Sequence, residues 1–226
     1  MSGNAGSGYF ISPQGGPGPG VLLLHSLWGL NRHAKDTANR LADHGFTVVA
    51  PDLNAGQEFE DPAEALAALH EADMNVTASL VQSSLSVLRK AALNPTAPIG
   101  VVGYGPGASW ALWVSARLVE EVGAVVTYYG AQNIQMDGAR ASYLCHWAEN
   151  DLLVSDLEVA DLGLNLQMAE LDFRFEHHEG TTSGFAEDGR PEFDAEAEAV
   201  AWRQTAEFLA ERLGVHGSGE EEGEEE

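Results

Sequence analysis

The sequence is poor in cysteine and in positive charge, and it lacks any long apolar run. Its 226 residues include one cysteine, Cys145, so an intramolecular disulfide is excluded. Only 11 Lys and Arg stand against 35 Asp and Glu, which leaves a formal net charge of −24. Phosphate binding needs a basic face, so we expect neither nucleic acid nor an anionic membrane as a partner. No apolar run approaches the roughly 20 residues that cross a bilayer.

The beginning of the chain carries no recognisable targeting signal. The segment MSGNAGSGYFISPQGG has neither a charged n-region nor an apolar h-region, so we do not expect secretion through a signal peptide. Together with the single thiol, this favours a cytoplasmic location.

Apolar residues are nevertheless abundant enough to fill a core. They make up 44 % of the chain, which indicates a globular protein despite the charge. Six of the acidic residues lie in the final segment VHGSGEEEGEEE, and we expect residues 215–226 to form a disordered acidic tail. Residues 20–214 are predicted to form a single domain, preceded by a flexible or edge-strand lead-in at residues 1–19.

Short apolar runs alternate with amphipathic segments along most of the chain. Asn31 and Asp61 are predicted helix N-caps, Gly45 ends the first helix, and the final helix is expected over residues 192–213. Strands that alternate with helices predict an α/β fold with a doubly wound, mostly parallel sheet and helices on both faces. The predicted strands are VLLLHS (21–26), FTVVAP (46–51), PIGVVGY (98–104), GAVVTYYG (123–130), SYLCHWAE (142–149) and DFRFEHH (172–178).

One strand-to-helix junction draws attention, because ligands of such sheets bind beyond the carboxyl ends of the strands. The segment Gly103-Tyr104-Gly105-Pro106-Gly107 combines a strand, a G-x-x-x-G turn and a helix, as in a nucleophile elbow. The central residue of an elbow should be Ser, Cys or Asp, and here it is Gly105. The junction therefore predicts an elbow without a nucleophile.

Four further segments resemble the dienelactone hydrolase family in their order and spacing. They are HSLWGL (25–30), GFTVVAPDL (45–53), AEND (148–151) and GFAEDGRP (184–191), and Ala201-Trp202-Arg203 resembles the last helix of that family. The resemblance covers about residues 20–213. It implies an α/β-hydrolase fold and a Cys-His-Asp triad that acts on lactones or esters.

Most positions that the resemblance marks as catalytic carry other residues here. The nucleophile position falls on Gly105, the general-base position on Ser183, and the position of the family's glutamate beside the nucleophile on Ser26. The acid position alone is kept, as Asp151. Because no covalent intermediate can form on a glycine, we expect family-type hydrolysis to be lost.

The supporting positions of the resemblance have changed as well. The residue after the nucleophile should donate its N–H to the oxyanion hole, but here it is Pro106, which has no N–H. Losing one such donor costs about 10²–10³ in rate. The Leu27 amide is the other candidate donor. The arginines that bind the substrate carboxylate in the family fall near Gly56 and on Glu187, which disfavours acidic lactones as ligands.

For the remaining reactive side chains, a structural role is weighed against a catalytic one. Without a histidine at position 183, Asp151 is interpreted as a loop carboxylate that caps the helix beginning near Ser155. Ser26 is the alternative nucleophile, but a hydroxyl needs a base within reach, for which His177 and His178 are the candidates. Cys145 is interpreted as an inert core thiol.

The pocket is expected above Gly105. Trp28 and Tyr104 would form an apolar wall for a small ligand, whereas His25 is expected to make a structural hydrogen bond. No cysteine or histidine cluster has ligand spacing, so we expect no metal and no cofactor. The predicted pocket residues are His25, Leu27, Trp28, Tyr104 and Pro106, together with Ser26.

Two functions follow as hypotheses. One is a protein that has lost the catalytic residues and binds a small apolar ligand or ester, or serves as an interaction protein or assembly scaffold. The other is an active ester or lactone hydrolase that uses relocated residues such as Ser26. The sequence leaves the oligomeric state open.

Overall fold

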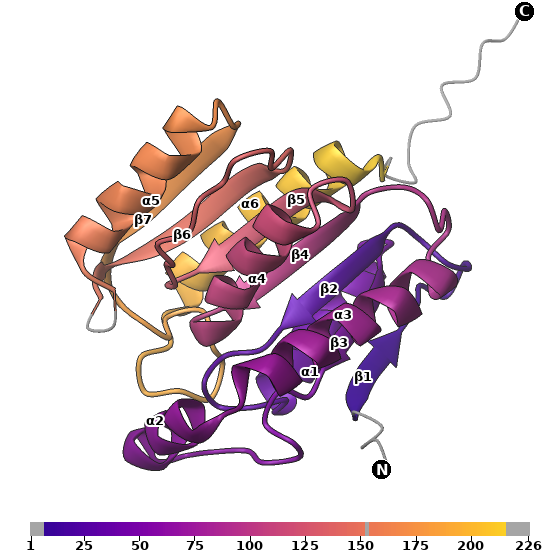
Figure 1. Ribbon diagram of the computed structural model, residues 1–226. Helices are drawn as coiled ribbons and strands as arrows, with labels where there is room; N and C mark the ends of the chain where they lie inside the picture. The colour runs from indigo at the N-terminus through magenta and orange to yellow at the C-terminus, as the bar shows by residue number, and fades with distance from the viewer. Residues whose placement is uncertain (1–6, 152–153, 216–226) are drawn as a thin grey trace, which may run out of the picture.

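One seven-stranded sheet runs through the molecule in the order β1-β3-β2-β4-β5-β6-β7 (Figure 1). The computed structural model describes residues 7–151 and 154–215; segments 1–6 and 152–153, and nearly all of the expected acidic tail, lie outside the described residues. Strand β1 (Gly8–Ile11) lies at the edge and pairs antiparallel with β3, whereas the other five neighbouring pairs are parallel. The predicted mostly parallel sheet is confirmed.

The central strands are buried on both faces, as their unbroken apolar runs predict. Every residue of β2, β3 and β4 is buried. The last strand extends beyond the predicted segment 172–178 because Thr182 still pairs with Asn150 of the neighbouring strand. The strands are β2 (Gly20–Leu24), β3 (Thr47–Pro51), β4 (Ile99–Tyr104), β5 (Val122–Tyr128), β6 (Ser142–Asn150) and β7 (Phe173–Thr182).

Helices cover both faces of the sheet, and their starts follow the predicted caps. The side chain of Asn31 accepts a hydrogen bond from the Ala34 N–H, and that of Asp61 accepts from the Ala63 N–H. Pro62 then opens its helix at the first position. The helices are α1 (Arg32–Asp43), α2 (Pro62–Glu71), α3 (Met74–Ala91), α4 (Pro106–Arg117), α5 (Asp156–Met168) and α6 (Ala195–Leu213).

The apolar core is divided by the sheet into two layers. On one face, α1 and α6 pack against alternate residues of the strands, and on the other face α3, α4 and α5 do so. This is the doubly wound arrangement that the sequence predicts. Representative core residues are Val21, Leu23, Leu41 and Leu209 on the first face, and Leu22, Leu85, Leu112 and Leu162 on the second.

Candidate functional site

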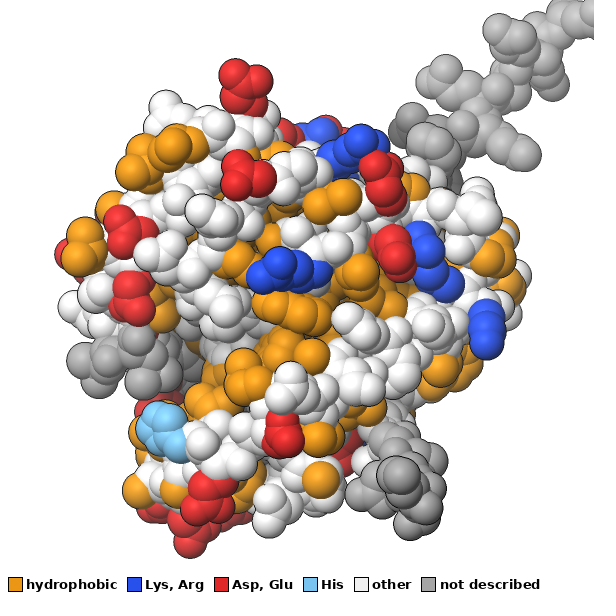
Figure 2. All heavy atoms as spheres, in the orientation of Figure 1, with side chains coloured by type: hydrophobic (Ala, Val, Ile, Leu, Met, Phe, Trp, Pro, Cys, Tyr) orange, Lys and Arg blue, Asp and Glu red, His pale blue; other side chains and the backbone are white. Residues whose placement is uncertain are grey.

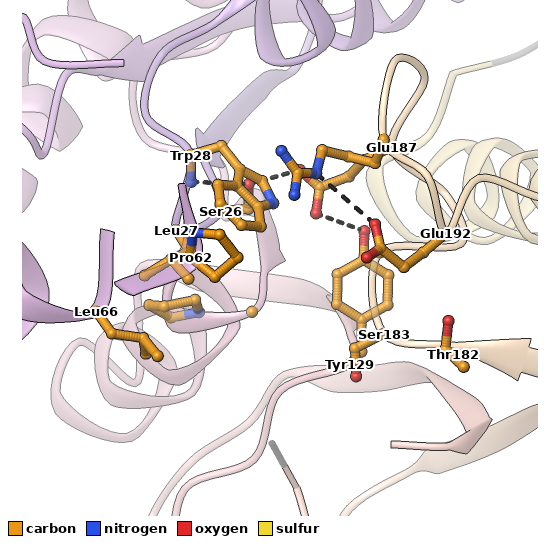
Figure 3. Close-up of a pocket in the computed structure, with 14 residues that line it drawn as sticks. Ser26, Leu27, Trp28, Pro62, Leu66, Tyr129, Thr182, Ser183, Glu187 and Glu192 are labelled. Carbon is orange, nitrogen blue, oxygen red and sulfur yellow. Dashed lines mark hydrogen bonds and ion pairs between the residues drawn. The ribbon is translucent and has the colours of Figure 1, made fainter. Parts of the chain in front are cut away.

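A cavity of about 400 Å³ lies at the carboxyl ends of the strands (Figure 3). Ser26 follows β2, Gly105 follows β4, Tyr129 follows β5 and Ser183 follows β7, so four strand ends meet there. Ligands of open α/β sheets bind at this edge. The remaining lining residues are Leu27, Trp28, Pro62, Leu66, Pro106, Thr182, Gly184, Glu187, Arg190 and Glu192.

The elbow at the end of β4 keeps its geometry although its central side chain is missing. Gly105 has φ +51° and ψ −116°, and its N–H donates to the Tyr128 carbonyl at 2.9 Å. A Cβ placed on Gly105 would meet nothing within 4 Å, whereas one on Gly103 would lie 2.3 Å from the Gly107 carbonyl oxygen. The flanking glycines are therefore required by close packing, and the central position opens into the cavity.

The turn into α4 also lacks a donor. Pro106 is the first residue of that helix and has no N–H, so the position that completes an oxyanion hole in an elbow offers none here. Leu27, the other candidate donor, lines the cavity beside it.

A buried carboxyl group forms the polar floor of the cavity. Glu187 is 2 % exposed; the Ser26 hydroxyl donates to its Oε2 at 2.5 Å and the Tyr129 hydroxyl to its Oε1 at 2.9 Å (Figure 3). Burial raises the pKa of Glu187 to about 7, and the two hydrogen bonds and the nearby Arg190 limit the rise. The Ser26 hydroxyl is thus held by a carboxyl group, and sequence reasoning did not find this pair.

Among the residues that the structure describes, no histidine side chain is hydrogen-bonded to the Ser26 hydroxyl. The ring of His178 contacts that of His146, with 3.1 Å between Nε2 and Nδ1, and the His146 Nε2 lies 3.1 Å from the Thr205 hydroxyl of α6. His177 is exposed. The hypothesis of a Ser26 dyad with His177 or His178 is therefore wrong, because the inward-facing histidine is directed at the network beneath α6.

His25 has a structural role, as expected. Its Nε2 accepts a hydrogen bond from the Leu53 N–H at 2.9 Å, which leaves the proton on Nδ1 to donate to the Ser26 carbonyl at 2.7 Å. Burial lowers the pKa of His25, so the ring is neutral near pH 7. It faces a small neighbouring cavity of about 30 Å³ instead of the large one.

The prediction that Tyr104 forms a wall of the pocket is wrong. Tyr104 is 4 % exposed and its ring stacks on that of Tyr128, with 4.3 Å between centroids, in the core layer beneath α1 and α6. It is the last residue of β4, and side chains alternate between faces along a strand. The aromatic wall is supplied by Trp28, as predicted, and by Tyr129, which follows β5 and was missed.

A cationic side chain, that of Arg190, lies over the ring of Trp28. The guanidinium carbon of Arg190 lies 3.5 Å from the ring centroid, and the Arg190 Nε is 3.8 Å from a carboxylate oxygen of Glu192. Glu187, Arg190 and Glu192 are the charged side chains of the cavity lining. Carboxyl groups therefore outnumber cations at this site.

The other two triad positions carry Ser183 and Asp151. Ser183 lines the cavity, and within the part of the chain that the structure describes its buried hydroxyl has no hydrogen-bond partner. Asp151 accepts a hydrogen bond from the Val154 N–H at 3.0 Å. The N-cap of α5 is Ser155, in a capping box with Glu158, so Asp151 does not cap this helix as we expected.

Cys145 lies in β6 and is fully buried, and burial raises its pKa to about 12. This confirms the expected inert core thiol. Across residues 7–151 and 154–215, no group of three or more His, Cys, Asp or Glu side chains is placed to hold a metal ion. No helix in these ranges is long and apolar enough to cross a bilayer.

A second cavity of about 400 Å³ lies on the other side of Pro106. It shares Leu27, Leu66, Gly105, Pro106 and Tyr129 with the first, so the two meet above the elbow. Figure 2 shows a band of apolar side chains across the middle of this face, where α2, α3 and α4 approach one another. The elbow is thus surrounded by apolar surface on both sides.

A mostly parallel sheet of this order, with an elbow after β4, defines a protein of the α/β-hydrolase fold. The family model described as "Dienelactone hydrolase family" matches residues 7–213, and the chain belongs to that family. The resemblance of its sequence motifs to those of the dienelactone hydrolase family is therefore confirmed.

Individual relatives agree with this assignment. The chain is 26 % identical to Protein usf from Aquifex pyrophilus over 91 % of this chain and 93 % of that protein. It is 28 % identical to a carboxymethylenebutenolidase from Pseudomonas putida over 53 % of each chain. Among solved structures, it is similar to a dienelactone hydrolase-like promiscuous phosphotriesterase from metagenomic libraries, with 26 % identity, a TM-score of 0.81, and coverage of 92 % and 93 % of the two chains.

Proposed function

We propose that this protein is a member of the dienelactone hydrolase family that binds a small, largely apolar ligand or ester and does not hydrolyse it by the family's covalent route. The observation that carries the proposal is Gly105, which occupies the centre of an intact elbow with open space above it. Without a side chain there, no acyl intermediate can form. Ser183 at the base position and Pro106 at the donor position remove two further requirements of the reaction.

The shape and lining of the cavity support binding. A volume of about 400 Å³ lies within the range of small-molecule sites, which spans roughly 300–1,000 Å³. Leu27, Trp28, Pro62, Leu66 and Pro106 give it apolar walls, and Ser26 and Glu187 give it buried polar groups. A few polar groups within an apolar lining are typical of ligand pockets.

The test is a turnover measurement with p-nitrophenyl acetate and with several lactones. We expect no rate above that of a heat-denatured sample of the same protein. A robust rate that a single substitution in the cavity abolishes would contradict the proposal. The matched control for such a substitution is Glu149→Gln, which removes an exposed carboxylate outside the cavity lining.

One contact favours a second candidate, an ester hydrolase with Ser26 as nucleophile. The 2.5 Å hydrogen bond from Ser26 to Glu187 pairs a hydroxyl with a proton acceptor whose pKa, about 7, suits a general base. A fluorophosphonate probe distinguishes the two candidates. Stoichiometric labelling that Ser26→Ala abolishes would establish the second, and labelling that ignores this substitution would count against it.

A further inference from the structure

Within the part of the chain that the structure describes, no cationic side chain forms an ion pair with the Glu187 carboxyl group, although this group is buried at a cavity floor. Its hydrogen-bond donors are the hydroxyls of Ser26 and Tyr129, which are both neutral. Within the described ranges, no ion pair of 4.0 Å or less reaches Glu187. A buried carboxylate without a countercharge is costly, because neutral donors compensate only part of its lost hydration.

Arg190, whose charge lowers the pKa of Glu187, makes its cation–π contact and its ion pair with other residues. The Arg190 guanidinium lies over the Trp28 ring, and the carboxylate that it approaches is that of Glu192. Arg190 favours the ionised form of Glu187 while Glu192 disfavours it, so the two act in opposite directions. The cavity therefore presents a carboxyl group that a positively charged ligand could neutralise.

We propose that the cavity selects organic cations, and that the ammonium group of a primary amine binds at Glu187 while its apolar body packs against Leu66 and Pro106. This inference rests on the proposed binding function and names its ligand class. Each Glu187 oxygen accepts one hydrogen bond from a neighbouring hydroxyl, and a carboxylate has further lone pairs for a third donor.

Two further features of the molecule favour a cation. The aromatic ring of Tyr129 lines the same cavity, and the face of an aromatic ring attracts cations. The formal net charge of −24 raises the local concentration of positively charged solutes around the protein. Both effects oppose the binding of a carboxylate ligand.

The two phenols near Glu187 do not titrate in the pH range in which Glu187 does. Tyr129, in the turn after β5, donates a hydrogen bond to Glu187, and Tyr104 of β4 interacts with it electrostatically. Burial raises the pKa of both phenols well above the ordinary value. They therefore stay neutral near pH 7. Arg190 and Glu192 lie on the same loop and act on the pKa of Glu187 in opposite directions.

The experiment compares three ligands of one ring size, namely benzylamine, benzyl alcohol and benzoate, by NMR titration of the full-length protein. We expect benzylamine to bind about 10-fold more tightly than benzyl alcohol, and benzoate to bind most weakly. Raising the pH from about 6 to about 8 should tighten benzylamine binding about 10-fold, because Glu187 ionises while an alkyl ammonium stays protonated. Benzyl alcohol should show no such increase.

Two variants test whether the preference for benzylamine depends on Glu187. Glu187→Gln should abolish the preference for benzylamine over benzyl alcohol. Glu192→Gln, which removes a carboxylate from the more exposed rim, should keep the preference within about 2-fold. Should Glu187→Gln fail to fold, the pH dependence of the wild-type protein decides the matter.

The outcomes separate the inference from the function on which it rests. Equal binding of benzylamine and benzyl alcohol, or a preference that survives Glu187→Gln, would overturn cation selectivity and leave the binding function standing. Binding of neither compound, together with ester turnover, would overturn both.

Discussion

The hydroxyl of Ser26 donates a hydrogen bond of 2.5 Å to the carboxyl group of Glu187, a residue 161 positions further along the chain. The contact joins the loop after β2 to the loop after β7 across the cavity floor. It directs the Ser26 proton to Glu187 and fixes the carboxyl group beside Tyr129. The polar centre of the cavity thus lies beside the elbow instead of on it.

The raised pKa of Glu187 predicts a pH-dependent stability. Its folded-state pKa is about 7 against an ordinary value of 4.5, so the folded state holds more protons between these values. The free energy of unfolding should therefore fall as pH rises through this range, by about 3 kcal/mol in all. Glu187→Gln, which is neutral at every pH, should remove this fall.

Urea unfolding of both proteins at a series of pH values measures the effect. The difference between the two free energies of unfolding isolates Glu187, because the buried histidines titrate equally in both proteins. A difference that stays constant between about pH 5 and about pH 8 would show that Glu187 is not a proton-binding group of the folded state.

The open space above the elbow predicts that a cysteine placed at position 105 is reactive. Gly105→Cys should take up one equivalent of iodoacetamide in the folded protein, because its side chain projects into the cavity. The native Cys145 is buried, so the wild-type protein should take up none until it is unfolded. Intact mass spectrometry counts the adducts. An unlabelled folded variant that takes up two equivalents in denaturant would place the side chain out of reach.

The glycines of the elbow should tolerate substitution very unequally. A Cβ on Gly107 would lie 2.2 Å from the Leu24 carbonyl oxygen, so Gly107→Ala should lower the free energy of unfolding by roughly 3 kcal/mol or more. Gly105→Ala meets no atom and bears only the cost of its positive φ, about 1–2 kcal/mol. Denaturant melts of both variants measure the contrast, and equal losses would argue against the elbow packing described above.

The buried network beneath α6 should depend on one hydroxyl. The Thr205 Oγ1 lies 2.7 Å from the Tyr128 hydroxyl and 3.1 Å from the His146 Nε2. Thr205→Val keeps the shape but leaves both partners poorly satisfied, so we expect a loss of about 2 kcal/mol. Thr205→Ser retains the hydroxyl and should lose less. Thermal or urea melts rank the two variants, and a valine variant as stable as the serine variant would contradict the role of the network.

Local signals in the sequence were sufficient to predict the sheet and the elbow. Buried parallel strands are continuous apolar runs, and Asn31 and Asp61 are side chains that satisfy the first N–H groups of a helix. The glycines at 103 and 107 mark a turn in which backbone approaches backbone. Each of these features is decided by residues close together in the chain.

The floor of the cavity could not be predicted in the same way. The partner of Ser26 lies in a distant loop, and only the folded sheet brings Glu187 and Tyr129 to it. Tyr104 was misplaced because the face of a residue at a strand end depends on where the strand stops. One signal in the sequence pointed to this group. The resemblance places an arginine of the family at position 187, and this chain has the oppositely charged Glu187 there.

We propose that the cavity binds an ester without cleaving it. One NMR experiment tests both the binding and the absence of cleavage. Phenyl acetate is incubated with the protein while saturation transfer to the ester and the appearance of free acetate are followed together. We expect saturation transfer to the intact ester, and acetate release no faster than with heat-denatured protein. Acetate that accumulates rapidly with the wild-type protein but not with Ser26→Ala would contradict it.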